Sequence, residues 1–87
     1  MAWYRLAYRP AILQERESLE PSMANRLLDK SKWIASNIDN LRHEPIAPDL
    51  PGLFKYAVED WRIFYSIDRD DHLVDIHGFV RHRELRS

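Results

Sequence analysis

The last third of the sequence alternates apolar and polar residues, and this pattern restricts the fold more than any other feature. Three such runs span Leu53–Val58, Trp61–Asp68 and Leu73–Val80. Two short polar segments separate them, Glu59–Asp60 and Arg69–His72. Side chains alternate across a strand, and short polar connections join antiparallel neighbours. We therefore expect two hairpins that form a three-strand meander.

The first half of the chain predicts a strand followed by two helices. Aromatic residues favour a strand over Trp3–Tyr8, and Pro10 suits the first turn of a helix. A short amphipathic helix is expected over Ala11–Leu19, and Pro21 separates it from the next helix. That second helix is expected to restart at Pro21, and from Ala24 to Leu41 its apolar residues recur at helical spacing.

Three prolines between His43 and Gly52 predict a stiff loop between the helices and the meander. The predicted fold class is α+β: a small antiparallel-rich sheet, made of the N-terminal strand and the C-terminal three-strand meander, packs on a two-helix hairpin. With 87 residues, the chain is expected to form a single domain over residues 1–87. The helices would cover one face of the sheet and leave the other face free.

The composition excludes several classes of function. The chain has no cysteine, which removes disulfides, thiolate catalysis and cysteine-bound zinc. No apolar run reaches the ~20 residues of a membrane helix, and the first residues do not resemble a signal peptide, so we expect a cytoplasmic protein. The net charge of −1 gives no general attraction for nucleic acid or membranes. Such binding would need a local patch, and the basic residues 81–87 supply one.

The period of two assigns side chains to the free face of the sheet. The more apolar set of each strand is expected to face the helices. The opposite set holds the cationic or titratable residues Lys55, Arg62, His77, Arg81 and Arg83 and the aromatic residues Phe64 and Phe79. Cations can stabilise the charge that builds on a phosphodiester during cleavage, and aromatic rings can stack on unpaired bases. The pattern fits single-stranded RNA, but it is also typical of an ordinary solvated sheet face.

The histidines do not indicate a metal centre. His77 and His82 are five residues apart, which places them on opposite faces of one strand. His43 and His72 fall at a helix end and in a turn, where histidines are usually solvated. The sequence also contains no Gly-rich phosphate loop and no HExxH motif. We expect neither a metal nor a small-molecule cofactor.

Two segments resemble the RelE/ParE toxin superfamily of type II toxin–antitoxin systems. They are the run from Lys55 to Ile67, KYAVEDWRIFYSI, and the later run from Val80 to Glu84, VRHRE. The aromatic first strand followed by Pro10 and Ala11 is similar as well. The resemblance implies a small sheet backed by a helical hairpin and a cognate antitoxin protein as partner. RelE-type members of the superfamily cleave mRNA in the ribosome, whereas other members inhibit DNA gyrase without being nucleases. The resemblance therefore implies one of these two activities.

The resemblance carries site residues over position by position. Lys55 matches a basic residue of the first hairpin strand, Arg62 matches the arginine that ends the hairpin motif, and His82–Arg83 match a late histidine–arginine pair. The expected catalytic residues are Arg62, Arg83, Arg81, Lys55 and His82. The expected RNA-binding residues are Phe64, His77, Phe79 and Arg86. His82 or His77 would transfer the proton, and exposed Trp3 or Trp33 would contact the antitoxin.

The sequence also departs from the family pattern. Ala57 stands where an arginine or lysine is common, Glu59 where glycine makes the tight turn, and Arg81 where glycine precedes histidine. The base-stacking tyrosine expected near the end is missing, so stacking would come from Phe64 or Phe79. Three functions stay open: a metal-independent, ribosome-dependent mRNA endoribonuclease, a ParE-like gyrase inhibitor, and an inactive module that binds an antitoxin.

Overall fold

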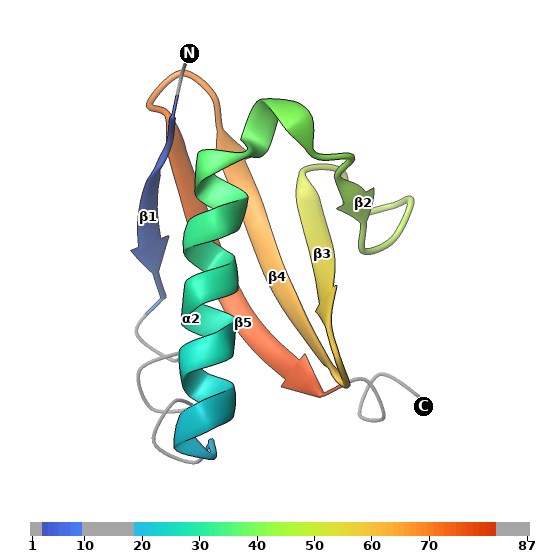
Figure 1. Cartoon of the computed structure of the whole chain (residues 1–87). Coiled ribbons are helices and arrows are strands. Elements are labelled where there is room, and N and C mark those ends of the chain that lie inside the picture. The colour runs from blue at the N-terminus through green and yellow to red at the C-terminus, as the bar shows by residue number, and fades with distance from the viewer. Residues whose placement is uncertain (1–2, 10–18, 82–87) are drawn as a thin grey trace.

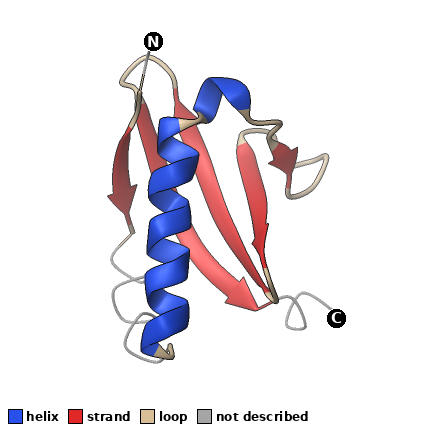
Figure 2. Cartoon of the chain, in the orientation of Figure 1, coloured by secondary structure: helices blue, strands red, loops and turns tan. Residues whose placement is uncertain are grey.

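The computed structural model describes residues 3–9 and 19–81 (Figure 1). Five strands and one α-helix occur in this part of the chain (Figure 2). In chain order they are β1 (Arg5–Tyr8), α2 (Pro21–Ser36), the 3₁₀ turn η1 (Ile38–Asn40), β2 (Glu44–Pro45), β3 (Leu53–Val58), β4 (Trp61–Asp68) and β5 (Leu73–Arg81). The predicted bounds of β3 and β4 are confirmed, and β5 extends one residue beyond its predicted end.

The strands form one mixed sheet in the order β1-β5-β4-β3-β2. The meander of β3, β4 and β5 is antiparallel, as predicted, whereas β1 pairs with β5 in parallel. Strand β1 can be parallel because the connection that contains α2 carries the chain back across the sheet before the meander begins. Helix α2 lies over one face of the sheet, and the strands leave their opposite face on the far side (Figure 1).

The predicted two-helix hairpin is not found in the described residues, which contain one α-helix. The first helix, expected over Ala11–Leu19, lies outside the described residues apart from Leu19, which is in a bend. Helix α2 begins at Pro21, where the second helix was predicted to restart, because proline fits the first turn, where no backbone N–H is needed. It ends at Ser36, before the predicted Leu41, because the side-chain amide of Asn37 donates a hydrogen bond to the carbonyl of Trp33 at 2.8 Å.

The core lies between α2 and the inner face of the sheet. Its largest fully buried side chains are Leu27 and Ile34 of the helix and Ile63, Tyr65, Val74 and Ile76 of β4 and β5. Ser31 is also fully buried, and its hydroxyl donates to the carbonyl of Leu27 at 2.7 Å. A buried hydroxyl needs such a partner, so this bond makes serine tolerable on the packed face of the helix.

A histidine closes the core at the end where α2 stops. His43 Nε2 lies 2.9 Å from the carbonyl of Ile38, and Nδ1 lies 2.7 Å from the hydroxyl of Tyr65. A carbonyl only accepts, so Nε2 carries the proton and Nδ1 accepts from Tyr65. Burial, with a smaller contribution from nearby Tyr56, raises the pKa of Tyr65 to about 12. His43 is therefore a structural link and not a solvated polar residue as predicted.

The proline-rich segment is mostly loop, as predicted, but it includes a short edge strand. In β2, Glu44 pairs with Lys55 and Pro45 pairs with Phe54. Proline is tolerated there because an edge strand needs no second partner. The following turn passes through Gly52, whose φ of 92° lies in the region that glycine adopts without a steric penalty.

A β-bulge in β5 changes which side chains face the helix. The register shifts between Phe64, which pairs with Gly78, and Tyr65, which pairs with Ile76, so His77 is the additional residue. A bulge inserts one residue and thus reverses the alternation that follows it. Beyond the bulge, Phe79 lies opposite Ile63 and is only 5% exposed.

Four predicted face assignments in β5 are therefore wrong. Phe79 and Arg81 lie on the helix side of the sheet and not on the free face, because both come after the bulge. Gly78 and Val80 were expected toward the helix and instead pair with Phe64 and Arg62 of the free face. Sequence alternation alone cannot locate such an insertion.

Candidate functional site

The candidate site is the sheet face turned away from α2, which we call the outer face. Residues that pair across neighbouring strands lie side by side on this face. The outer face carries Glu44 of β2, Lys55 and Ala57 of β3, Arg62, Phe64 and Ser66 of β4, and Asp75, His77 and Val80 of β5. On β1 it continues through Arg5 and Ala7. Three of the predicted site residues, Lys55, Arg62 and Phe64, thus share this face with His77.

Lys55 and Phe64 form the centre of the outer face. They are direct partners in the β3–β4 pair, and both are half-buried. Lys55 Nζ lies 3.8 Å from Glu44 Oε1 on the edge strand, where the glutamate is 69% exposed. Because this ion pair is exposed to solvent, it holds the lysine weakly, and a phosphate could replace the glutamate. On the other side of Phe64, Gly78 adds no side chain next to the ring.

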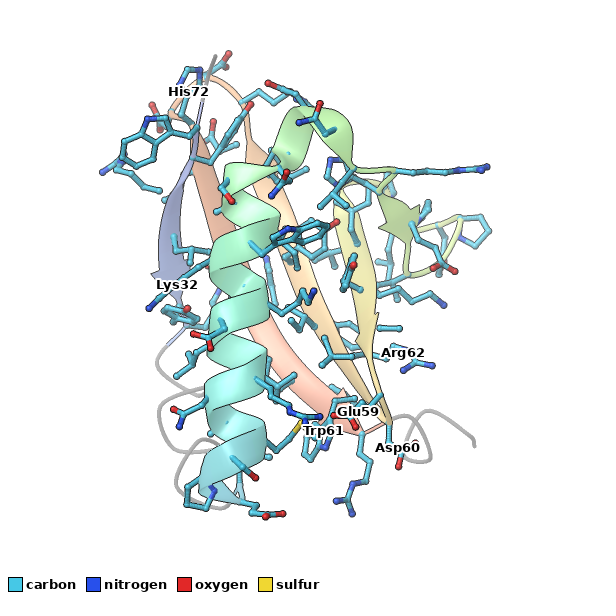
Figure 3. All side chains as sticks on the ribbon, viewed as in Figure 1. Lys32, Glu59, Asp60, Trp61, Arg62 and His72 are labelled. Carbon is cyan, nitrogen blue, oxygen red and sulfur yellow. The ribbon has the colours of Figure 1, made fainter. Side chains whose placement is uncertain are left out.

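Arg62 lies at the end of the outer face where β3 turns into β4, beside Glu59 and Asp60 (Figure 3). Its Nη1 donates to the carbonyl of Trp61 at 2.9 Å and to that of Glu59 at 3.1 Å. These bonds fix the guanidinium over the turn. Its other N–H groups bind no acceptor in the described part of the chain, so a fork of donors is left for an anion.

The turn itself is attached to the helix. Glu59 has a φ of 53°, in the left-handed region that glycine would adopt more easily. Its carboxylate forms an ion pair with Arg26 of α2. The hairpin therefore forms although Glu59 stands where the family pattern has glycine. The glutamate also makes a contact with Arg26 that glycine could not make.

His77 belongs to a polar cluster next to Phe64. Its Nε2 lies 2.8 Å from the hydroxyl oxygen of Ser66 and 3.9 Å from Asp75 Oδ2. The same carboxylate oxygen lies 3.0 Å from Arg9 Nη2. Burial lowers the pKa of His77, the charge of Arg9 lowers it further, and Asp75 opposes both. The neutral ring is therefore favoured at pH 7, and it can accept a proton.

Other predicted site residues lie elsewhere. The guanidinium of Arg81 lies 5.2 Å from the centre of the Trp61 ring, on the helix side of the sheet, in a cation–π contact. Phe79 is part of the core and cannot stack on a base. His82, Arg83 and Arg86 lie outside the described residues.

Ser66, Asp75 and Arg9 were not among the site residues predicted from the sequence. One usable signal existed, because the Arg69–His72 turn sets the register that pairs Ser66 with Asp75. A second signal is Gly78, because an isolated glycine inside a strand-like run often marks a β-bulge.

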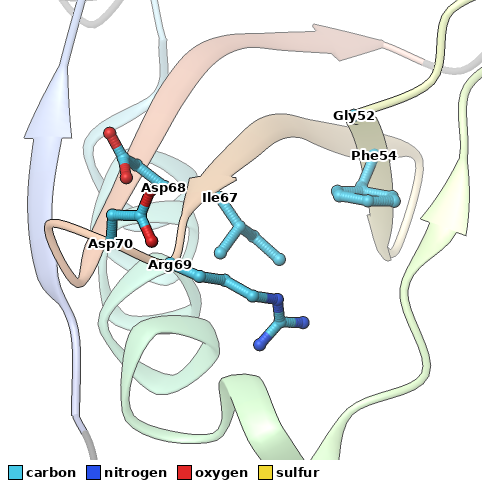
Figure 4. A pocket seen from close by; sticks show the side chains of 6 residues that line it. All are labelled: Gly52, Phe54, Ile67, Asp68, Arg69 and Asp70. Carbon is cyan, nitrogen blue, oxygen red and sulfur yellow. The ribbon is translucent and has the colours of Figure 1, made fainter.

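Two hollows of the described surface lie away from the outer-face residues. One of about 460 Å³ is lined by Gly52, Phe54, Ile67, Asp68, Arg69 and Asp70 (Figure 4). Another, of about 320 Å³, lies between α2 and the β3–β4 turn and is lined by Arg26, Asp29, Lys30, Trp33, Val58 and Glu59. Within residues 3–9 and 19–81, no group of three or more potential ligands could hold a metal ion, and no helix is long and apolar enough to cross a membrane.

Solved structures of similar fold are toxins of the RelE type. The RelBE2 toxin–antitoxin complex from Mycobacterium tuberculosis matches with a TM-score of 0.81 and 17% identity, over 93% of each chain. A mutant of the Escherichia coli toxin RelE in the free state matches with a TM-score of 0.78 and 14% identity, over 97% of this chain and 88% of that one. The archaeal RelE–RelB complex from Pyrococcus horikoshii has a TM-score of 0.73 and 16% identity, over 99% and 100%. At these identities the matches show the fold.

The sequence itself decides the family. No curated protein matches the chain significantly. A family model described as the ParE toxin of type II toxin–antitoxin system, parDE, matches residues 6–86, which is nearly the whole chain. The chain therefore belongs to the ParE toxin family of type II toxin–antitoxin systems, within the RelE/ParE superfamily.

Proposed function

We propose that this toxin is a ribosome-dependent endoribonuclease that cleaves mRNA during translation and so inhibits protein synthesis. The observation that carries the proposal is the row formed by Lys55, Phe64 and the Ser66–His77 pair on three adjacent strands of the outer face. Adjacent strands lie ~4.8 Å apart, so the row offers a cation, an aromatic ring and a proton acceptor within about 10 Å.

Each member of the row has a chemical role in the proposal. Lys55 and the free N–H groups of Arg62 bind the scissile phosphate and stabilise the charge that develops on it. Phe64 stacks on an unpaired base next to that phosphate. The reaction is attack of a ribose 2′-hydroxyl on its own phosphate, which needs a proton acceptor but no metal ion.

The basic residues of the chain end complete the proposed site. Arg83 keeps the phosphate-binding role that the family resemblance implies, His82 is the alternative to His77 for proton transfer, and Arg86 is an RNA contact. Arg81 supports Trp61 where β5 ends and leads into these residues. Its own role toward RNA is secondary, because its guanidinium is on the helix side.

Dependence on the ribosome follows from the charge of the chain. Proteins bind free RNA mainly by neutralising its phosphates with positive charge, and this chain carries a net charge of −1. Its intrinsic affinity for free mRNA is therefore expected to be low. A ribosome can compensate because it presents the mRNA at a fixed place and holds the toxin next to it.

We further propose a cytoplasmic toxin with a cognate antitoxin protein as its partner. Three solved relatives are complexes of a RelE-type toxin with its antitoxin. Two tryptophans of this chain are available to such a partner, Trp3 with 74% and Trp33 with 40% exposure. Lys30 lies 4.6 Å from the centre of the Trp33 ring and would contribute charge to the same contact.

A reconstituted bacterial translation reaction tests the proposal. Purified toxin is added to a defined mRNA with and without ribosomes, and the cleavage sites are mapped by primer extension. Cleavage that occurs only on translated mRNA supports the proposed activity. Intact mRNA at toxin concentrations that stop growth in cells contradicts it.

Inhibition of DNA gyrase is the second candidate. The family model that matches is that of ParE, and the outer face has neither Phe79 nor Arg81 to contribute to RNA binding. A supercoiling assay with purified gyrase, run beside the translation reaction, separates the two. Blocked supercoiling together with intact mRNA would establish gyrase as the target.

A further inference from the structure

We infer that His77 is the general base of the proposed cleavage and that Ser66 is its positioning residue. This inference rests on the proposed ribonuclease function. It assigns the proton-transfer step to the outer face of β5, where the imidazole of His77 shares the face with Phe64 and Lys55.

A β-bulge lies at the position of His77. His77 is the additional residue between the pairs Tyr65–Ile76 and Phe64–Gly78. The bulge places Gly78, and not His77, directly opposite Phe64, while His77 stays on the same face as Ser66 and Asp75. The Ser66 hydroxyl oxygen and His77 Nε2 are 2.8 Å apart. About a quarter of the His77 side chain stays accessible, enough for one ring nitrogen to meet a substrate.

The charges around the ring select one tautomer. Asp75 Oδ2 is 3.9 Å from Nε2, and a nearby carboxylate favours a proton on the nitrogen that faces it. Nε2–H then donates to the Ser66 hydroxyl, and Nδ1 keeps its lone pair. No hydrogen bond to Nδ1 is found among the described residues. The free nitrogen is therefore the acceptor for a substrate proton.

Whether the His77 ring is neutral depends on its partial burial and on three neighbouring groups. Ser66 of β4 holds it without adding charge, Asp75 of β5 favours the protonated ring, and Arg9, just after β1, disfavours it. The carboxylate is shared, because Asp75 Oδ2 is closer to Arg9 Nη2, at 3.0 Å, than to the ring. Partial burial is the main cause that lowers the pKa of His77 below the ordinary 6.5, and the charge of Arg9 lowers it further. After the ring accepts a proton, Asp75 stabilises the resulting imidazolium.

The chemical step balances as follows. His77 Nδ1 takes the proton of the ribose 2′-hydroxyl, and the 2′-oxygen forms a bond to its own phosphorus. The bond from phosphorus to the 5′-oxygen of the next nucleotide breaks, and that oxygen takes a proton from water. The products are a 2′,3′-cyclic phosphate and a free 5′-hydroxyl, and the imidazolium returns its proton to solvent.

The test compares the same substitution at two histidines. His77→Asn removes the proposed base, and His72→Asn changes a histidine of the β4–β5 turn whose φ of 50° asparagine tolerates. Ser66→Ala removes only the positioning hydroxyl. Single-turnover cleavage on translating ribosomes is measured from pH 5.5 to 8.5 for each variant, and circular dichroism confirms that each is folded.

We expect His77→Asn to lower the cleavage rate about 10²- to 10⁴-fold at pH 7.5 and His72→Asn to leave it unchanged. The wild-type rate should fall below pH 6.5 with the titration of one group, and the His77→Asn rate should lose this dependence. Added imidazole should restore part of the activity of a His77→Ala variant. Ser66→Ala should reduce the rate less and shift the acid limb of the pH profile.

Two results would overturn the inference in different ways. If the wild type cleaves and a folded His77→Asn variant cleaves at the same rate with the same pH profile, His77 is not the base although the ribonuclease function stands. If the wild type itself does not cleave, the proposed function fails and the role of His77 fails with it.

Discussion

Lys55 of β3 and Phe64 of β4 lie directly opposite each other at the centre of the outer face. In an antiparallel pair such residues are ~4.5–5.5 Å apart at Cβ, so a phosphate on the lysine and a base on the ring can belong to neighbouring parts of one RNA strand. The pair joins the two kinds of contact that single-stranded RNA needs. It also depends on the β3–β4 register alone, which the bulge does not alter.

Replacement of the outer-face ring should weaken substrate binding more than it weakens the fold. Phe64→Leu keeps an apolar side chain of similar volume but removes the stacking surface. Loss of one base stack costs ~1–3 kcal/mol, so we expect KM for cleavage to rise by about 5- to 150-fold. Tyr56→Leu, a matched change on the helix side of β3, should leave KM unchanged. Equal effects of the two variants would contradict stacking by Phe64.

The two phenylalanines that the sequence placed together should differ in their contribution to stability. Phe79 is only 5% exposed and belongs to the core, so Phe79→Ala should destabilise the fold by about 3–5 kcal/mol. Phe64 is half-buried on the opposite face, and Phe64→Ala should cost clearly less. Urea unfolding followed by tryptophan fluorescence measures both. A Phe79→Ala variant as stable as Phe64→Ala would mean that the bulge is absent.

Tyr65 should make the fold sensitive to alkaline pH. Burial raises its pKa to about 12 in the folded chain, whereas an unfolded tyrosine titrates near 10. Between these values the unfolded chain has lost the proton and the folded chain has kept it, so stability falls as pH rises from about 10 to 12. Below pH 10 the contribution is fully present.

The matched variant for this prediction is Tyr65→Phe. It leaves His43 Nδ1 without its donor, which should cost about 1–3 kcal/mol at pH 8. It should also lose less stability than the wild type as pH rises above 10. Thermal unfolding of both proteins at pH 8, 10 and 11 provides the comparison, and parallel pH curves would show that Tyr65 does not titrate in this range.

The β3–β4 turn should prefer glycine over alanine at position 59. Glu59 has a positive φ of 53°, and a non-glycine residue in the left-handed region loses roughly 1 kcal/mol. Both Glu59→Gly and Glu59→Ala remove the ion pair with Arg26, so their difference isolates the backbone effect. We expect Glu59→Gly to be the more stable of the two by about 1 kcal/mol in urea unfolding. The reverse order would rule out strain at this turn.

Much of the fold could be predicted because local rules decide it. The bounds of β3 and β4 follow from alternating apolar residues and polar turns, and Pro21 marks the region where α2 begins. The parallel pairing of β1 with β5 could not be predicted, since it depends on how the intervening connection crosses the sheet. The end of α2 was missed because the apolar spacing continues through Ile38 and Leu41, past the side-chain bonds of Asn37.

The candidate site was predicted only up to the bulge. Lys55, Arg62 and Phe64 precede β5 and lie on the expected face, and His77 is the residue at which the alternation breaks. Phe79 and Arg81 follow it and face the helix. Strict alternation assigns the residues after an inserted one to the wrong face, and the sequence signal for this insertion is Gly78, an isolated glycine within the strand.

The most direct test of the outer face compares two lysines that differ only in their location. Lys55 lies at the centre of the outer face, and Lys32 is exposed on α2 on the opposite side of the molecule (Figure 3). Both become alanine, and mRNA cleavage is measured by primer extension in a reconstituted translation reaction. We predict a loss of about 10²-fold for Lys55→Ala and none for Lys32→Ala. Cleavage that is equally fast in both variants would contradict a catalytic outer face.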